Sequence, residues 1–379
     1  MLRSLTSFIL SLLIALVLSA CGSNSGSSGS STTSTAIIGM AVNGNTLYVA
    51  NADKQVIQAL DLTTFAVTTF AGGAGVAGTS NGTGIAARFY DPFSLVFIAG
   101  GGGAPDMLYV TDTFNHGIRA INTGTQAVTT LSGSLGTSGA TDGVSASARF
   151  NSPKGITTDG SSLFVADSGN YLIRTVDKTS GAVSTPIGTS GQSGYVDGLG
   201  ASVKFGNPFA VAATSTFVYV SDPGNNSIRS VQLTGGGAGT VATLAGSTSG
   251  TSGTTDNATA GQGTTARFNT PAGIVSDGTN IFVADSGSHT IRMIEISSGK
   301  VSTIAGLAGT SGSTDGTDGA SARFNTPTGL AINAAGTVLY VSDQNYTKVR
   351  KIVLATAGVF TFATTNTGAV RVSTLNATF

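Results

Sequence analysis

Residues 150–188 read FNSPKGITTDGSSLFVADSGNYLIRTVDKTSGAVSTPIG, and this stretch decides the fold because the chain repeats it. Four short runs rich in β-branched and aromatic residues are separated by Gly, Asp, Asn and Ser, which is typical of strands joined by tight turns. The connections are short enough to require antiparallel neighbours. The stretch therefore predicts one four-stranded antiparallel sheet.

The pattern occurs five times, and a sixth copy, which keeps fewer of the repeated residues, precedes them in the chain. Each close copy contains Arg/Lys-Phe-x-x-Pro, then Tyr/Phe-Val-x-Asp, an Arg seven residues after the Asp, and Val-x-Thr-Leu/Ile-Ala-Gly or a close variant. The Asp, here termed the repeat aspartate, recurs every 55–63 residues and is Asn in the first copy: Asn51, Asp112, Asp167, Asp222, Asp285 and Asp343. Units of this size cannot each bury a core, so they must pack against one another.

Four-stranded antiparallel units repeated around an axis form a β-propeller. We expect an all-β, six-bladed propeller over residues 37–379, with blades of approximately 37–88, 89–149, 150–204, 205–267, 268–323 and 324–379. A linear β-solenoid is the competing geometry, but its coils are usually much shorter than this period. Each blade is expected to be contiguous, so that side-chain packing between the first and sixth blades closes the ring.

The segment Tyr109-Val-Thr-Asp112-Thr-Phe-Asn115-His116-Gly-Ile118-Arg119 resembles the NHL repeat, and variants of it end at Arg174, Arg229, Arg292 and Arg350. The resemblance covers residues 37–379 and implies a six-bladed propeller. The family includes protein-binding, RNA-binding and sensor modules, and some related propellers are enzymes. The resemblance therefore does not identify a function.

The first 36 residues have a different composition. A positive start at Arg3 precedes an apolar stretch, residues 8–18, that is too short to span a bilayer with ease. Leu18-Ser19-Ala20-Cys21 and a Ser/Gly/Thr tract follow. This resembles a bacterial lipoprotein, with residues 1–20 as the signal peptide, Cys21 as the lipidated residue and 21–36 as a flexible tether. No Asp follows Cys21, which by the Gram-negative sorting rule favours the outer membrane, with the propeller in the periplasm or at the cell surface.

Charged residues are sparse and balanced, with 18 basic and 18 acidic side chains. No long-range field is available to attract nucleic acid or an anionic membrane surface. Most of these charges recur with the repeat, including four acids in the Gly-rich links between copies, here termed the link aspartates: Asp142, Asp197, Asp256 and Asp315. Residues repeated in every blade are expected to build the blades.

Three structural roles follow for the repeated residues. The repeat aspartate is expected to accept hydrogen bonds from its own turn. It is also expected to pair with the arginine seven residues later, because the first copy has Asn51 and Gln58 and so lacks both charges together. The repeat phenylalanine is expected to form an apolar wedge between blades, and a ring of aromatic ligand contacts is the alternative.

Candidate catalytic residues are few. His116 and His289 stand three blades apart, and a β-turn role fits them better than a shared metal or proton. Propeller lyases of the NHL type hold a zinc ion with histidines that this chain lacks, and lactonase-like propellers use an inner-strand Glu, whereas Glu295 falls on a third strand. No cofactor is expected; calcium at Asp315 and Asp318 is the remaining alternative, because only these link acids are paired.

The sequence thus favours a membrane-anchored extracytoplasmic scaffold that binds a protein, peptide or glycan partner on one propeller face. The alternative is a lactonase- or lyase-like enzyme with a site at the axial channel mouth, built from Asn43, Asn207 and Asn333. A sensor ectodomain is disfavoured, since nothing after residue 21 looks transmembrane. Departures from the repeat, where binding residues are expected, are the inserts at 100–107, 235–239 and 355–369.

Overall fold

The computed structural model describes residues 37–343, 348–354, 358–366 and 369–371. The predicted signal peptide, Cys21 and the tether lie outside the described residues. Within the described part, no helix has the length and apolar character needed to cross a membrane.

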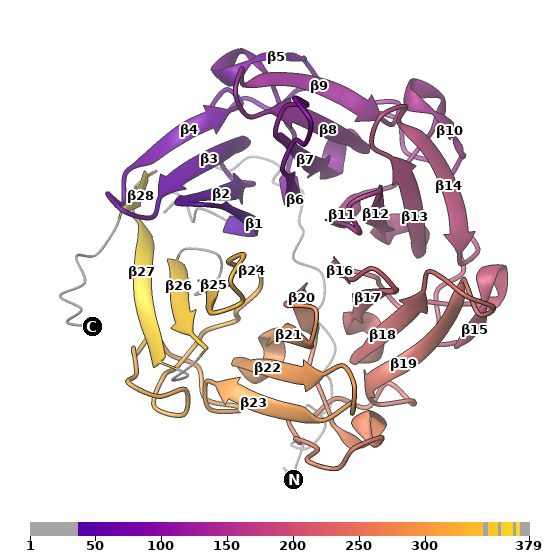
Figure 1. Cartoon of the computed structure of the whole chain (residues 1–379), viewed down its shortest axis with the longest axis vertical. Coiled ribbons are helices and arrows are strands. Elements are labelled where there is room, and N and C mark those ends of the chain that lie inside the picture. Colours follow the sequence, from indigo (N-terminus) through magenta and orange to yellow (C-terminus); the bar gives the residue numbers. More distant parts are fainter. Residues whose placement is uncertain (1–36, 344–347, 355–357, 367–368, 372–379) are drawn as a thin grey trace, which may run out of the picture. The chain divides into compact units, whose positions relative to one another are not determined.

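Six antiparallel sheets stand around a central axis, and the chain visits them in order (Figure 1). Blade one contains β1 (Ile37–Asn43), β2 (Thr46–Asn51), β3 (Val56–Asp61) and β4 (Val67–Ala71). Blade two contains β5 (Gly82–Thr83), η1 (Gly84–Ala86), β6 (Pro92–Ile98), β7 (Met107–Asp112), η2 (Thr113–Asn115), β8 (Gly117–Asn122) and β9 (Ala127–Ser132). Blade three contains β10 (Gly143–Val144), η3 (Ser145–Ser147), β11 (Pro153–Thr158), β12 (Ser162–Asp167), η4 (Ser168–Asn170), β13 (Leu172–Asp177) and β14 (Ala182–Ile187).

The remaining blades follow the same plan. Blade four contains β15 (Gly198–Leu199), η5 (Gly200–Ser202), β16 (Val211–Ala213), β17 (Phe217–Asp222), η6 (Pro223–Asn225), β18 (Ser227–Gln232) and β19 (Thr240–Gly246). Blade five contains η7 (Gly263–Thr265), β20 (Pro271–Ser276), β21 (Asn280–Asp285), η8 (Ser286–Ser288), β22 (Thr290–Glu295) and β23 (Val301–Ala305). Blade six contains β24 (Leu330–Ile332), β25 (Val338–Asp343), β26 (Lys348–Val353), β27 (Gly358–Asn366) and β28 (Ala369–Arg371).

The six-bladed, all-β architecture is confirmed, but four sheets have a fifth strand that the four-stranded prediction lacks. In blades two, three and four this strand has two residues and comes from the Gly-rich link, as in the pairing of Gly143 with Val183. The link thus covers part of the outer edge of the following blade, where backbone groups would otherwise face solvent. Two residues beside Gly carry no strand pattern, so the sequence does not reveal them.

Each hydrophobic core lies between two blades. Phe150, for example, packs with Tyr109 and Ile118 of blade two and with Leu163 and Val165 of blade three. The repeat phenylalanine is fully buried in every copy that has one, which confirms the apolar wedge. In four copies the glycine that ends the repeat permits this contact: Gly72, Gly133, Gly246 and Gly306. A Cβ on Gly133, whose φ is +103°, would lie 3.3 Å from the Phe150 ring and 2.7 Å from a backbone oxygen.

The ring closes as expected, by packing between the first and sixth blades. Met40, Leu47 and Val49 share a core cluster with Ala331 and Tyr340. The innermost strands also approach closely here: a Cβ placed on Gly329 would lie only 1.8 Å from the Ile38 backbone oxygen. A side chain at position 329 would therefore push blades one and six apart.

The predicted pairing of repeat aspartate and arginine is confirmed in blades two to six. In blade three, Arg174 Nη1 donates to Asp167 Oδ2 at 2.9 Å, and neither side chain is exposed. The remaining donors correct the prediction. The Asn170 side chain of the turn donates to the same carboxylate, but the backbone donor is Asn151 N, at 2.7 Å, from the loop before β11.

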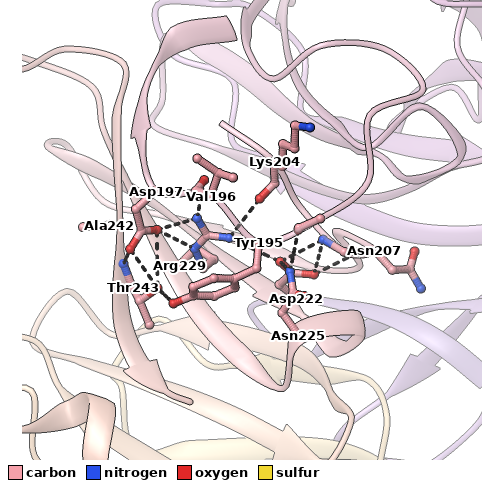
Figure 2. A network of polar contacts seen from close by, with 12 residues as sticks. Tyr195, Val196, Asp197, Lys204, Asn207, Asp222, Asn225, Arg229, Ala242 and Thr243 are labelled. Carbon is pink, nitrogen blue, oxygen red and sulfur yellow. Dashed lines mark hydrogen bonds and ion pairs between the residues drawn. The ribbon is translucent and has the colours of Figure 1, made fainter. Parts of the chain in front are cut away.

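The repeat arginine reaches beyond its own hairpin. Arg174 Nη2 donates to the link aspartate Asp142 at 2.7 Å, while Arg174 Nη1 donates to the Arg149 backbone oxygen at 3.0 Å. Its guanidinium also lies 5.1 Å from the Phe150 ring centroid, a cation–π contact. Figure 2 shows the same network in blade four, where Arg229 joins Asp222 and Asp197. One guanidinium therefore connects a hairpin, a link and the wedge phenylalanine.

Blade one and the buried carboxylates show what the charges contribute. Blade one replaces the ion pair by a neutral hydrogen bond of 2.9 Å from Asn51 to Gln58. In the charged blades, burial raises the pKa of Asp112, Asp167 and Asp285 to about 6, although the arginine and the other donors oppose this effect. Desolvation thus offsets part of the ion-pair attraction, and the gain lies in the connections that the pair makes.

We predict that Asp167→Ala lowers the stability by about 3 kcal/mol, because it leaves a buried guanidinium without its innermost partner. Asp142→Ala removes the half-exposed partner of the same arginine and should cost only about 1 kcal/mol, since solvent screens that pair. Thermal and denaturant unfolding of both variants measure this difference. Equal losses, or an unchanged Asp167→Ala, would contradict the assignment of Asp167 as the principal structural partner.

Candidate functional site

The edges of the six innermost strands surround a cavity of about 240 Å³ along the axis. Its described lining consists of Gly, Ala, Val, Ile, Leu, Met, Phe, Ser and Thr residues, with no acid, base or amide side chain among them. Such a wall provides no group for proton transfer or metal binding. Chemistry or recognition must therefore be sought at the ends of the cavity.

Charged and aromatic side chains gather at one end, the face that carries the turns between second and third strands. We term them the mouth cluster: Asp53, Tyr90, Asp91, Phe93, Phe114, Lys154 and Phe209. They come from blades one to four, and most of them stand where the repeat has small or uncharged residues in the other copies. The mouth cluster thus consists mostly of side chains that differ from those at the same positions in the other copies, and the repeated blade structure holds them in place.

Lys154 occupies the centre of the aromatic part of the cluster. Phe93 of blade two and Phe209 of blade four contact each other edge to face, with ring centroids 5.1 Å apart. The ammonium of Lys154, from the intervening blade three, lies 4.9 Å from the Phe209 centroid and 5.7 Å from that of Phe93. Both rings therefore hold this cation beside the cavity.

Tyr90 and Phe114 extend the cluster outward. Their ring centroids are 5.1 Å apart at an interplanar angle of 73°, and the two residues are 44% and 39% exposed. Blades three to six have Asn or Gly in place of Tyr90. In place of Phe114, blades three to five have Gly and blade one has Asp53. In blade three the glycine is needed, since a Cβ on Gly169 would meet Asn151 at 2.6 Å. Only blade two presents an aromatic pair here among the described turns.

Asp91, which stands between Tyr90 and Phe93 in the chain, has a left-handed backbone conformation, φ 58°. Its N–H donates to Gln55 Oε1 of blade one at 2.6 Å. The side chain is half-buried, yet none of the residues that the structure describes donates a hydrogen bond to its carboxylate. The corresponding positions hold Ser152, Asn207 and Thr270, so the carboxylate is peculiar to blade two.

Burial raises the pKa of the Asp91 carboxyl to about 6. Lys154 opposes this shift, while the carboxylates of Asp112 and Asp53 reinforce it. A carboxylate that is partly desolvated and lacks protein donors costs stability in its ionised form. Groups of this kind are typical of functional sites, because their partner is absent from the fold itself.

We predict that Asp91→Asn raises the stability above pH 6. In the folded state Asp91 holds its proton up to pH about 6, against about 4 in the unfolded chain, so its ionisation destabilises the fold at higher pH. The gain should be about 2 kcal/mol at pH 7 and should disappear as the pH falls to about 4. Urea unfolding between pH 4 and 8 measures it.

Ser152→Asn is the matched control, since it places Asn at the equivalent left-handed position of blade three without removing a carboxylate. Its effect on stability should not change over the same pH range. A loss of stability in Asp91→Asn at pH 7 would instead make Asp91 a structural residue.

The polar residues named for an enzymatic site do not come together. Asn207 lies on the turn face, where its N–H donates to Asp222. Asn43 pairs with Thr46 at the opposite end of the innermost strand. Asn333 uses its side chain to cap its own hairpin, with Oδ1 accepting from Thr337 N and Val338 N, both at 2.9 Å. These three residues therefore do not form one site at the channel mouth.

His116 and His289 lie in turns, as predicted, each in the left-handed position that ends a short 3-10 helix. Each also joins two blades, which the sequence did not suggest. His116 Nδ1 accepts from Ser152 N at 3.0 Å, and His289 Nδ1 accepts from Thr326 N at 3.1 Å. Burial lowers the pKa of His116, in keeping with an imidazole that accepts a hydrogen bond. Among the described residues, no three His, Cys, Asp or Glu side chains gather to hold a metal ion.

The two acids named for calcium have separate partners. Asp315 accepts a hydrogen bond from Arg350 Nη2 at 2.7 Å, and Asp318 accepts one from Ser321 N at 2.8 Å. We predict that millimolar calcium leaves the Tm unchanged, because Arg350 already neutralises Asp315. Differential scanning calorimetry with calcium and with a chelator tests this. A rise in Tm that Asp318→Asn abolishes would establish the calcium site.

Comparison with known proteins agrees with this architecture. No family model matches the chain. Human NHL repeat-containing protein 2 is 28% identical over 296 residues, which cover 70% of this chain but only 40% of the human protein. The chain is an NHL-repeat β-propeller. Its match to the chicken relative of the same name likewise covers 37% of that relative's length.

Solved structures of other proteins have the same fold as this NHL propeller. An auxiliary nutrient binding protein from Bacteroides thetaiotaomicron superposes with a TM-score of 0.61 at 16% identity, covering 84% of this chain and 68% of the other. Virginiamycin B lyase from Staphylococcus aureus gives a TM-score of 0.50 at 11% identity, with coverage of 87% and 85%. At these identities the likeness concerns the fold alone.

The mouth cluster of the NHL propeller was not predicted from the sequence, because binding residues were expected in the inserted loops. The departures that matter are single side chains within a well-formed repeat. Aligning the six copies position by position would have found them, because Tyr90, Asp91 and Phe114 replace Asn, Gly, Ser or Thr in most other copies. Their convergence with Lys154 and Phe209 of later blades depends on the closed ring.

Proposed function

We propose that this chain is a lipid-anchored, extracytoplasmic binding module that presents the mouth cluster to a protein, peptide or glycan partner. Cys21 is the proposed lipid attachment site, residues 21–36 the tether, and the outer membrane the proposed location, with the propeller in the periplasm or at the cell surface. The support for the anchor is the lipoprotein-like sequence around Cys21.

The observation that carries the binding role is the contrast between the channel wall and its mouth. The described wall has no ionisable side chain, whereas the mouth combines exposed aromatic rings with Asp53, Asp91 and Lys154. Ligand sites of this composition hold a partner by apolar contact and orient it by a few polar groups. The nutrient binding protein from Bacteroides thetaiotaomicron supplies a precedent for a binding role on the same fold.

A lactonase- or lyase-like enzyme is the alternative. The lyase from Staphylococcus aureus shares the fold, but no three His, Cys, Asp or Glu side chains gather in the described part of this chain, and the described channel wall carries no acid or base. Binding without turnover is therefore the function that the geometry supports best.

Lipidation is tested in a bacterial host grown with an alkyne analogue of palmitate. We predict that the full-length chain is labelled and fractionates with the outer membrane, and that Cys21→Ser is neither labelled nor retained there, because Cys21 is the only cysteine. Ser19→Thr, which leaves the cysteine in place, serves as a control for processing. Membrane retention of unlabelled Cys21→Ser would contradict the lipid anchor.

Binding is tested on the same chain with photo-crosslinking residues at positions 114 and 199, which lie on the turn face and on the outer strand β15, respectively. Crosslinks to one defined partner from position 114 alone support the mouth cluster as the binding face. Mass spectrometry of the recovered partner then separates the two functions: an intact ligand supports binding, and a chemically altered one supports the enzyme.

A further inference from the structure

Resting on the proposed function, we propose that the partner is a neutral oligosaccharide, with one sugar ring against Tyr90 and Phe114 and a hydroxyl on the Asp91 carboxylate. Lys154 lies near Asp91 and supplies a donor to the ring oxygen or to a second hydroxyl.

The aromatic surface is suited to a sugar. Tyr90 and Phe114 are both more than one third exposed and meet edge to face, so part of this aromatic pair is open to solvent. The electron-rich face of an aromatic ring attracts the weakly positive C–H groups on the apolar side of a pyranose. A sugar also keeps its hydroxyl groups at the rim of the ring, where they can reach neighbouring polar side chains.

The polar groups select a neutral ligand. The ammonium of Lys154 already lies over Phe93 and Phe209, where a cationic ligand group would otherwise bind, and it repels a second cation. The carboxylates of Asp53 and Asp91 repel an anion. Hydroxyl groups suit both kinds of side chain, because each hydroxyl can donate to a carboxylate and accept from an ammonium.

Asp91 provides the specific contact. It is half-buried, its backbone is held by Gln55, and no described residue donates to its carboxylate. A charge-assisted hydrogen bond from a sugar hydroxyl would satisfy this acceptor. The fold thus keeps an acceptor in place at a cost to its own stability, as expected of a group that meets an external donor.

Two common modes of peptide binding are poorly supported. Addition of a peptide strand requires an open sheet edge, and the outermost strands β4 and β23 that keep one lie on the rim of the ring, away from the mouth cluster (Figure 1). A helical peptide requires an apolar groove, whereas acidic and basic side chains interrupt the mouth cluster. The axial cavity, at about 240 Å³, is also smaller than a usual ligand pocket. The ligand is therefore expected to rest on the mouth cluster.

The test is isothermal titration calorimetry of the purified full-length chain with maltohexaose, cellohexaose and mannohexaose. Hexagalacturonate, a chitosan hexamer and a pool of neutral and basic decapeptides are titrated in parallel. We expect at least one neutral hexasaccharide to bind. Tyr90→Ala and Phe114→Ala should each weaken it about tenfold, the range of a lost aromatic contact. Leu199→Ala, an exposed apolar residue on β15, should leave the affinity unchanged.

The pH dependence of the affinity in Asp91→Asn distinguishes a ligand contact from a purely structural role of this residue. The groups that face Asp91 are Lys154 near the start of β11, Asp112 at the end of β7 and Asp53 in the turn after β2. Because the ionised carboxylate is the better acceptor and forms above pH about 6, the affinity should increase as the pH rises from 5 to 7. Asp91→Asn should weaken binding about tenfold at pH 7 and abolish this pH dependence, while unfolding less readily.

The outcomes separate the inference from the proposed function. If a peptide or a charged sugar binds and Tyr90→Ala or Phe114→Ala abolishes that binding, the mouth cluster is a binding site and the oligosaccharide inference is wrong. If no neutral hexasaccharide binds at millimolar concentration, the inference is overturned. Binding that none of the three mouth variants changes would place the site elsewhere and would overturn both. Thermal unfolding of each variant verifies that it folds.

Discussion

A charged guanidinium lies in the interior of every blade from the second to the sixth, and the arrangement of the chain around it depends on its contacts. Each repeat arginine is almost completely buried and bonds to the repeat aspartate of its own hairpin. It also bonds to the backbone beside the wedge phenylalanine that opens its own repeat and stacks on that ring. A side chain with several fixed donors can join these segments, whereas an apolar residue of similar size could only fill the space.

This construction explains how a chain with few charges maintains a large ring. The individual sheets are small, and their cores lie between blades, so no blade has a complete core alone. The ion pairs orient each link and each wedge so that neighbouring cores can form. Blade one achieves a related geometry with Asn51 and Gln58. This neutral hydrogen bond indicates that a contact between the second and third strands is essential at this position, and that an ion pair is one way to form it.

The same construction determines where function can reside. The repeat arginines and aspartates are buried and engaged, so they are removed from recognition. The described channel wall is uncharged, since close packing of the innermost strands favours small residues. What remains is the turn face, where side chains can change without disturbing a core. Blade two uses this freedom at Tyr90, Asp91 and Phe114, and Asp91 combines partial burial with a carboxylate to which no described residue donates.

The period, the six blades, the antiparallel strands, the pairing of Asp and Arg, and the wedge role of phenylalanine can all be predicted from the amino-acid sequence alone. These features recur along the chain, and a local pattern that recurs in several copies can be recognised in the sequence. The two-residue fifth strands and the backbone donor to the repeat aspartate were decided by the tertiary structure, because both come from segments remote in the chain. The mouth cluster has the same origin. Phe93, Lys154 and Phe209 are spread over more than a hundred residues, and only closure of the ring brings an ammonium from one blade over the aromatic rings of its two neighbours.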